Sequence, residues 1–208
     1  VHLLHDSLLA AIACAERGGD PARALYWQAV LGRADAFRDL AVAKRAWADR
    51  IPADTSALDP GTASVLEDLR GLLAGMSSEF LPAIRAMSRA FELSQQSGQL
   101  RRAIALASNL GRAYWGMSEF QLAMEWLQRG IELARQARWP ASIALCLAQM
   151  GETLRRQGRI EEARKTLQEC LQLLAQQPHS RTAALALNYL AHTEQDAGQS
   201  EAALQAFE

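Results

Sequence analysis

Large apolar residues recur along most of this chain at the spacing of a helix face, with short polar breaks between segments. The clearest example is the stretch 108–133, which a break at Met117-Ser118 divides into two amphipathic segments. Spacings of four and seven residues place the large apolar positions of each segment on one face of an α-helix. These positions are Leu110, Tyr114, Phe120, Leu127 and Ile131. The pattern predicts a helical hairpin.

Local signals extend this prediction to the rest of the chain. Asp20-Pro21 and Asp59-Pro60 each place a capping carboxylate before a proline at the first helical position. Ser118 is the expected N-cap of the helix that follows it. The predicted helices span about 3–17, 21–35, 37–50, 61–75, 79–97, 100–115, 119–137, 140–157, 160–176 and 180–197, and a further helix starts at Ser200.

The chain also repeats itself at a fixed interval, the one that separates Gly71 from Gly111 (111 − 71 = 40). Small residues align in three columns at this interval, which are Gly71, Gly111, Gly151 and Ala191, then Ala83, Ala123, Ala163 and Ala203, then Ala90, Gly130 and Cys170. Large apolar residues align between them, as in Phe80, Phe120 and Ile160, or Met87, Leu127, Leu167 and Phe207. A fixed period of this length indicates an array of stacked structural repeats.

The period divides the chain into units of two helices. Gly18 lies two periods before Gly98, so 1–19 is interpreted as the second helix of a truncated unit. Four full units follow, 20–59, 60–99, 100–139 and 140–179, and 180–208 is a second truncated unit. We therefore expect a single repeat domain excised from a longer protein, an expectation that Val1 in place of an initiator methionine supports.

The small columns have a packing reason. Gly111 on a first helix and Ala123 on a second helix allow the two backbones to approach closely, and large side chains fill the space around the crossing. One helix pair leaves an apolar face uncovered, so neighbouring pairs stack and share a continuous core. The predicted fold is all-α, a right-handed solenoid of antiparallel helix pairs with about five units.

The best-formed units resemble the tetratricopeptide repeat. One match runs through Leu110, Gly111, Tyr114, Phe120, Ala123, Leu127, Gly130 and Ile131, and a second through Met150, Gly151, Leu154, Gly158, Ile160, Ala163, Leu167, Cys170 and Leu171. The usual unit has about 34 residues, whereas this one is longer by about one and a half helical turns. Long units are similar to those of bacterial maltose-activator-like transcription regulators, of repeat regions that precede diguanylate cyclase domains and of peptide-sensing regulators.

The resemblance implies binding of a protein or peptide, without chemistry of its own. We expect the regulatory or sensory segment of a larger bacterial signalling or transcription-regulating protein. A stand-alone oligomerisation or assembly scaffold is the alternative, and a homodimer formed through apolar stripes at the truncated ends is a further possibility.

Charge and composition exclude several other classes. Net charge is −1, from 22 basic and 23 acidic side chains spread along the chain, which argues against a nucleic-acid partner. No segment approaches the roughly 18 consecutive apolar residues of a membrane span. Three cysteines far apart in the sequence, Cys14, Cys146 and Cys170, favour a reducing compartment, so we expect a cytoplasmic protein.

Candidate chemistry is sparse. The four histidines, His2, His5, His179 and His192, are scattered, and none lies at a convincing helical spacing from another metal-type ligand. His2 and His5 are three residues apart, but they lie at a chain end beside no cysteine. No phosphate-binding glycine motif is present. Cys170 occupies a small-residue column and Cys146 lies among Ala and Leu, so packing explains both. We expect no enzyme activity, no cofactor and no metal.

Recognition is then assigned to the first helices, which line the concave side in arrays of this kind. The groove-facing candidates are Ser108, Arg112, Trp115, Glu152, Arg155, Arg156, Asn188, His192 and Gln195. Trp115 is either an exposed anchor or a packing residue against the next first helix. The arginines either bind a carboxylate or acidic peptide, or are ordinary solvated charges.

Overall fold

A computed structural model describes residues 2–199 of the 208-residue chain, apart from the side chains of residues 2–4 and 48. The described residues form ten α-helices and one short 3-10 helix, without a strand. The helices are α1 (His2–Arg17), α2 (Pro21–Arg38), α3 (Leu40–Trp47), η1 (Ala48–Arg50), α4 (Pro60–Met76), α5 (Phe80–Gln96), α6 (Leu100–Gly116), α7 (Phe120–Gln136), α8 (Pro140–Arg156), α9 (Ile160–Leu173) and α10 (Arg181–Asp196). The chain divides into two compact units, Val1–Leu106 and Ala107–Glu208.

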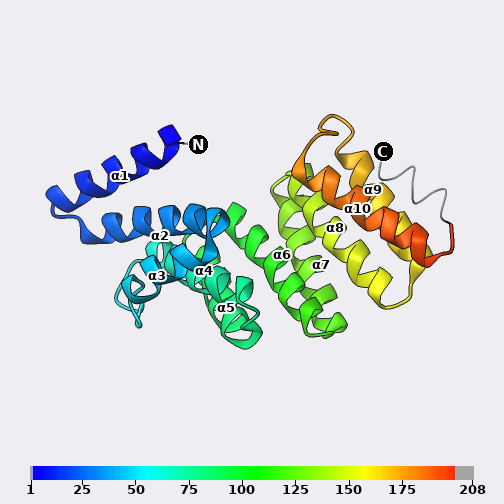
Figure 1. The fold of residues 1–208 in the computed structure, drawn as a ribbon, viewed down its shortest axis with the longest axis horizontal. Coiled ribbons are helices and arrows are strands. Elements are labelled where there is room, and N and C mark those ends of the chain that lie inside the picture. Colours follow the sequence, from blue (N-terminus) through cyan, green and yellow to red (C-terminus); the bar gives the residue numbers. More distant parts are fainter. Residues whose placement is uncertain (1, 200–208) are drawn as a thin grey trace. The chain divides into compact units, whose positions relative to one another are not determined.

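The predicted helices are confirmed, with boundaries that differ by a few residues. Consecutive helices such as α4 and α5 pack side by side as antiparallel hairpins (Figure 1). The segment expected as one helix over 37–50 is instead the end of α2, the short α3 and the 3-10 turn η1. The helix expected to start at Ser200 lies outside the described residues.

Most helices end in the same way, at a residue with left-handed backbone geometry. Positive φ angles occur at positions 78, 98, 118, 138, 158 and 198, which are spaced by half the repeat period or a multiple of it. After α6, for example, Ser118 N–H donates to Trp115 O and Glu119 N–H donates to Tyr114 O, each at 3.0 Å. This pair of bonds is a Schellman motif, and it satisfies carbonyls that the end of a helix leaves unpaired.

The expected role of Ser118 was wrong. Glu119 is the N-cap of α7 and makes no side-chain capping bond, whereas Ser118 is the left-handed residue of the turn, with φ 62°. The sequence signal was misleading because serine is a favoured N-cap. Here the position before the N-cap of α7 is occupied by the left-handed residue that ends α6. The caps expected at Asp20 and Asp59 are confirmed, since their carboxylates accept from Arg23 N–H and Thr62 N–H.

The repeated glycines mark close helix crossings. A Cβ added at Gly111 would lie 2.6 Å from Leu127 Cγ, and one added at Gly151 would lie 2.5 Å from Leu167 Cγ. A residue with a side chain would push these helices apart, because contacts this short are repulsive. The repeated glycine column is therefore a packing requirement.

The first full repeat unit, 20–59, contains the same helix crossing, displaced by one residue. A Cβ added at Gly32 would meet Trp47 and Leu69, so Gly32 is the counterpart of Gly71, one position short of a full period. Likewise the left-handed residue after α1 is Gly19, which is one position short of two periods before Gly98. The α2–α3 connection causes the shift, because Asp39 alone separates these helices where three residues separate α4 from α5. The sequence alignment of Gly18 with Gly98 was therefore one residue out of register.

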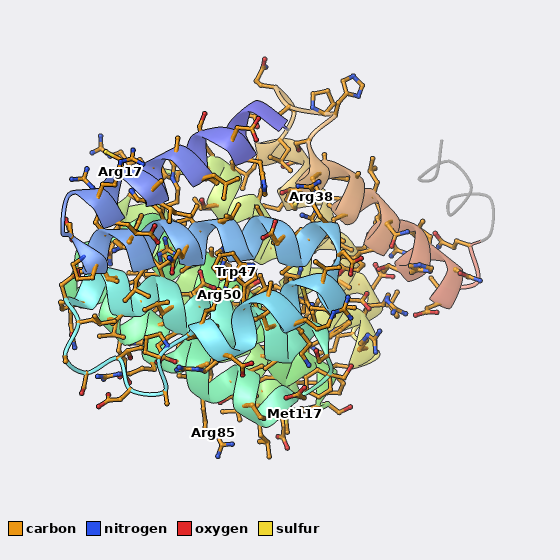
Figure 2. The ribbon with its side chains drawn as sticks, turned by 60° about the vertical axis from the view of Figure 1, so that its left-hand side comes forward. Arg17, Arg38, Trp47, Arg50, Arg85 and Met117 are labelled. Atoms are coloured by element: carbon orange, nitrogen blue, oxygen red, sulfur yellow. The ribbon has the colours of Figure 1, made fainter. Side chains whose placement is uncertain are left out.

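The long loop after η1 is attached to α4 by polar contacts. Thr55 donates from its hydroxyl to Glu67 Oε1 at 2.9 Å, and both residues are buried. Arg70 bonds Glu67 and the carbonyl of Pro52. At the end of α3, the Trp47 indole N–H donates to Asp35 at 3.0 Å. Arg50 lies beside this ring, with its guanidinium carbon 5.4 Å from the Trp47 ring centre (Figure 2). These bonds fix the irregular part of the first unit to its apolar core.

Candidate functional site

The Ala107–Glu208 unit gathers charged and aromatic side chains along its first helices, α6, α8 and α10. Glu152 on α8 is at the centre of this cluster and its side chain is only 3 % exposed. Arg155 binds it through two nitrogens, at 2.7 and 2.8 Å, and Arg156 Nε donates to it at 2.8 Å. Burial alone would raise the pKa of Glu152, but these hydrogen bonds and the two positive charges lower it. Glu152 is therefore an ionised, fully engaged carboxylate.

Arg155 connects this carboxylate to α10, the first helix of the following repeat unit. Its guanidinium also binds the carboxylate of Asp196 at the end of α10. The hydrogen bonds that Arg155 donates to both carboxylates raise its pKa, and burial opposes this shift. Arg155 is thus a tie between α8 and α10, and its donors are occupied within the protein.

Trp115 on α6 lies under Arg156 of α8, with the guanidinium carbon 4.0 Å from the ring centre. The ring is half-buried, so the structure combines the two alternatives for this residue: Trp115 packs against the next first helix and still has exposed surface. Its indole Nε1 is buried and has no hydrogen-bond partner, the one such side-chain atom among the described residues.

Tyr189 on α10 is a member of this cluster that the sequence prediction missed. Burial raises the pKa of its hydroxyl, and the negative charge of Glu152 adds to that effect, while Arg112, Arg156 and Arg155 oppose it. The Tyr189 hydroxyl therefore lies within electrostatic range of the charged groups of α6 and α8. Its position just after the candidate Asn188 was the available signal.

The remaining candidates are distributed differently from the prediction. Ser108 is buried, at 4 % exposure, and so contributes no open surface. Arg112, Asn188 and Gln195 are exposed, and His192 is half-buried. Within the described part of the chain, Arg112 has no carboxylate at ion-pair distance. Of the three arginines proposed for ligand binding, Arg112 is thus the one for which residues 2–199 supply no anionic partner.

Two family models described as tetratricopeptide repeat match the sequence, over residues 142–208 and 95–137. Together these matches cover more than half of the chain. The chain belongs to the tetratricopeptide repeat family. A search of curated proteins finds no significant match.

Solved structures with the same fold include several helical-repeat proteins. BtubC from P. vanneervenii has a TM-score of 0.70 at 16% identity, covering 97% of this chain and 86% of that one. RapI in its apo form has a TM-score of 0.71 at 12% identity, covering 90% and 68%. YrrB, described as a tetratricopeptide repeat protein with an unusual peptide-binding site, has a TM-score of 0.53 at 19% identity, covering 93% and 87%. At these identities the likeness shows the fold alone.

The Val1–Leu106 unit of this tetratricopeptide repeat chain has its own buried ion cluster. Asp68 on α4 is 4 % exposed and binds Arg33 of α2 and Arg102 at the start of α6. The cluster ties three successive first helices. Sequence reasoning missed it because Asp68 shares its column with Ser108, Ala148 and Asn188, none of which can make the same ion pairs.

A surface hollow of about 610 Å³ is lined by residues of α7 and by Met150 of α8. Met124 and Met150 are its apolar residues, and Gln121, Glu125, Gln128, Arg129 and Glu132 are its polar ones. The hydrogen bonds within it are Gln121 to Glu125 at 3.1 Å and Gln128 to Glu132 at 3.2 Å. The hollow is open and its polar groups are largely paired with one another.

The remaining candidates for chemistry are metal-type ligands, thiols and His5. No set of three or more His, Cys, Asp or Glu there is placed to hold a metal ion. Cys146 and Cys170 are buried, and burial raises the pKa of their thiols to about 12 and about 11. His5 Nδ1 lies 4.0 Å from Asp35 Oδ1. Over the same residues, no helix combines the length and apolarity that a bilayer crossing requires.

Proposed function

We propose that this chain is a peptide- or protein-binding scaffold, and that its ligand lies along α6, α8 and α10 of the Ala107–Glu208 unit. The observation that carries the proposal is the half-buried Trp115 under Arg156, on the same helix as Arg112, which has no carboxylate at ion-pair distance among the described residues. Tryptophan and arginine are among the side chains most enriched in residues that dominate binding energy at interfaces. The peptide-binding site named for YrrB supports the same class of ligand.

The candidate ligand-contacting residues are Arg112, Trp115, Arg156, Tyr189, Asn188, His192 and Gln195. Glu152 and Arg155 position this set, because their charges are committed to each other and to Asp196. Ser108 supports α6 from inside. The contacting side chains are held on helices, which lowers the entropic cost of ordering them when a ligand binds.

The biological setting that fits best is regulatory. The long repeat unit resembles that of bacterial signalling and transcription regulators, so we propose that this array is a sensory segment acting in the cytoplasm. Three free cysteines support a reducing compartment. A transcription reporter assay in bacterial cells that express the protein, with and without a bound peptide, tests this setting. An unchanged output would contradict it.

Selection of peptides from a random displayed library on the immobilised protein tests the binding proposal. Selected peptides are synthesised with a fluorophore, and their affinities are measured by fluorescence anisotropy. The variant Trp115→Ala/Arg112→Glu is expected to weaken binding by about 10-fold or more, since each removed contact is that of a central interface residue.

The chain offers a matched control for this experiment. Trp126 and Arg129 form a similar pair on α7, with the guanidinium carbon 5.3 Å from the ring centre. Trp126→Ala/Arg129→Glu makes the same chemical change on a second helix and is expected to leave affinity unchanged. Failure to enrich any peptide, or equal losses in the two double variants, would refute binding along the first helices.

A further inference from the structure

Trp27 on α2 differs from three other tryptophans of the chain. Trp47, Trp115 and Trp126 each have an arginine over the ring, with the guanidinium carbon 5.4, 4.0 and 5.3 Å from the ring centre. Among residues 2–199, Trp27 has no lysine or arginine over it, and its ring contact is with Tyr26. Those two ring centres are 5.2 Å apart and the ring planes meet at 90°. The pair therefore has aromatic faces in two directions, and no cation of the described chain covers them.

Both rings line a surface hollow of about 320 Å³ at the start of α2 and α4. These helices pack against each other, and their N-cap residues, Asp20 and Asp59, line the same hollow. A second hollow, of about 490 Å³, lies between α1 and α2 and shares Asp20, Arg23 and Trp27 with the first. Volumes in this range are typical of sites for small ligands.

The two carboxylates of the hollow have no cationic partner in the described part of the chain. Asp20 and Asp59 each accept an N-cap bond through Oδ1, from Arg23 N–H at 2.9 Å and from Thr62 N–H at 3.0 Å. No described lysine or arginine side chain is at ion-pair distance from either carboxylate. Hydrogen bonds from Thr62 lower the pKa of the Asp59 carboxyl, so this group is ionised at neutral pH. Negative charge thus lies beside two uncovered aromatic rings.

Arg23 and the two helix N-termini oppose a bound cation. The partial positive charge at the start of each helix is balanced by the aspartate that caps it. Arg23 is exposed, and residues 2–199 place no carboxylate at ion-pair distance from its guanidinium. An exposed arginine side chain extends into solvent at little cost, so its charge weakens a cation site here without filling it.

We propose that a quaternary ammonium group binds in this hollow, against the Tyr26 and Trp27 rings and beside the two capping carboxylates. Aromatic faces attract cations, and quaternary ammonium groups are the ligands that pairs or cages of such rings recognise best. A primary ammonium has three N–H donors that need acceptors, whereas Oδ1 of each aspartate is already used in capping. The site belongs to the Val1–Leu106 unit and does not depend on peptide binding along α6, α8 and α10.

Nuclear magnetic resonance of the full chain labelled with nitrogen-15 tests this site. The probe is choline, and the control is 3,3-dimethyl-1-butanol, which has the same shape with a carbon in place of the charged nitrogen. Trp27→Phe identifies the Trp27 indole resonance by its disappearance. We expect this resonance to shift saturably with choline, with a Kd on the order of 1 mM, and to respond about 10-fold more weakly to the alcohol. The Trp126 indole resonance, identified with Trp126→Phe, should stay unchanged, because Arg129 covers that ring.

Charge variants separate recognition from a structural role. Asp59→Asn keeps a good N-cap, because asparagine caps helices as well as aspartate does, and removes the charge. It should weaken choline binding about 3-fold or more and leave the affinity for the alcohol unchanged, while the melting temperature changes by less than about 4 °C. Arg23→Gln should strengthen choline binding by a similar factor, because it removes the opposing charge. Arg129→Gln on α7 is the matched control and should have no effect.

Equal binding of choline and the alcohol would show an apolar hollow without charge recognition and would overturn the proposal. An unchanged choline affinity in Asp59→Asn would also overturn it. The amide of N-acetyl-trimethyllysine distinguishes two sources of the group. Tighter binding of this compound than of choline indicates a methylated protein side chain, and tighter binding of choline indicates a free small molecule. If neither binds, the site is refuted, while peptide selection on the other unit is unaffected, so the two proposals fail separately.

Discussion

At the scale of single residues, neighbours with similar chemistry have different roles. Arg155 and Arg156 are adjacent in the sequence, yet Arg155 joins two carboxylates and Arg156 covers an aromatic ring. The direction of each side chain from α8 makes this difference, since consecutive helix positions point about 100° apart. Mutation of the first should therefore affect stability, and mutation of the second should affect recognition.

Glu152→Gln tests the structural half of this contrast. The change removes the buried negative charge that two arginines share, although Arg155 keeps Asp196 as a partner. We expect a loss of about 1–3 kcal/mol in the free energy of unfolding, measured by urea denaturation. Glu125→Gln on the exposed face of α7 is the control and should change stability by less than about 0.5 kcal/mol. Equal effects would contradict the central role of Glu152.

Cysteine reactivity gives a second prediction at this scale. Cys14 is exposed, whereas Cys146 and Cys170 are buried and their thiols have raised pKa values. Because the thiolate is the reactive form, iodoacetamide at pH 8 should modify Cys14 alone in the folded protein and all three cysteines in denaturant. Intact-mass spectrometry counts the labels. Two or three labels under native conditions would show that the buried thiols are accessible.

At the scale of the helices, a left-handed residue follows the end of most helices. Glycine occupies this position after α5, α8 and α10, but Ser78, Ser118 and Arg138 occupy it after α4, α6 and α7. Side chains with a Cβ are strained in this conformation. These three turns hold their residues because the Schellman bonds and the packing of the following helix leave no alternative position for the chain reversal.

Ser118→Gly should therefore stabilise the protein, by about 0.5–1 kcal/mol, and Gly158→Ala should destabilise it by about 1–2 kcal/mol. The adjacent turn residue Met117 is exposed and lies outside the left-handed region. Met117→Gly raises chain entropy in the unfolded state without relieving strain, so it should lower stability slightly. Thermal unfolding by circular dichroism measures all three. A destabilising Ser118→Gly would contradict strain at this turn.

The helix crossings give a further prediction. Gly151→Ala places a methyl group 2.5 Å from Leu167 Cγ and should destabilise by about 1–3 kcal/mol, although alanine favours helices more than glycine does. At Gly75 the nearest atom to an added Cβ is the flexible end of Met87, at 3.3 Å. Gly75→Ala should be neutral or stabilising. In a Leu167→Ala background, Gly151→Ala should lose its effect, as measured by a double-mutant cycle in urea.

At the scale of the whole molecule, several carboxylates share a response to acid. The pKa of Asp54, Asp59, Glu152, Glu161 and Glu162 is lowered, in Glu152 against the effect of burial. A lowered pKa means that the unfolded chain binds protons before the folded chain does. The stability these groups contribute is complete above their ordinary pKa values of 3.8 and 4.5, and is lost as the pH falls through the lowered values.

The melting temperature should therefore be nearly constant from pH 8 to about pH 5 and fall steadily below that. At high pH the sign is reversed. Cys146 has an ordinary pKa of 9.0 that burial raises to about 12, so its protonated form favours the folded state and stability declines as the pH rises above 9.0. Differential scanning calorimetry across pH 3–10 measures both limbs. A melting temperature that rises on acidification would contradict the assigned carboxylate contacts.

The periodicity of the sequence determined the helices and their antiparallel pairing. Helix faces and small-residue columns are local patterns, and each column reports one crossing that recurs in every unit, so a single chain contains several observations of the same contact. Gly111, Gly151 and their large partners could be identified in this way. The resemblance to tetratricopeptide repeats rested on these positions, and the family matches confirm it.

Only the tertiary structure decided which residues of the candidate site are free. The repeat register placed Glu152, Arg155 and Arg156 together, but not the bond of Arg155 to Asp196, the cover of Arg156 over Trp115, or the membership of Tyr189. It also concealed Gly32, because the short α2–α3 connection shifts the first unit by one position. Ion pairs and orphaned donors depend on distances between side chains of different helices, whereas periodicity reports only the face on which each residue lies.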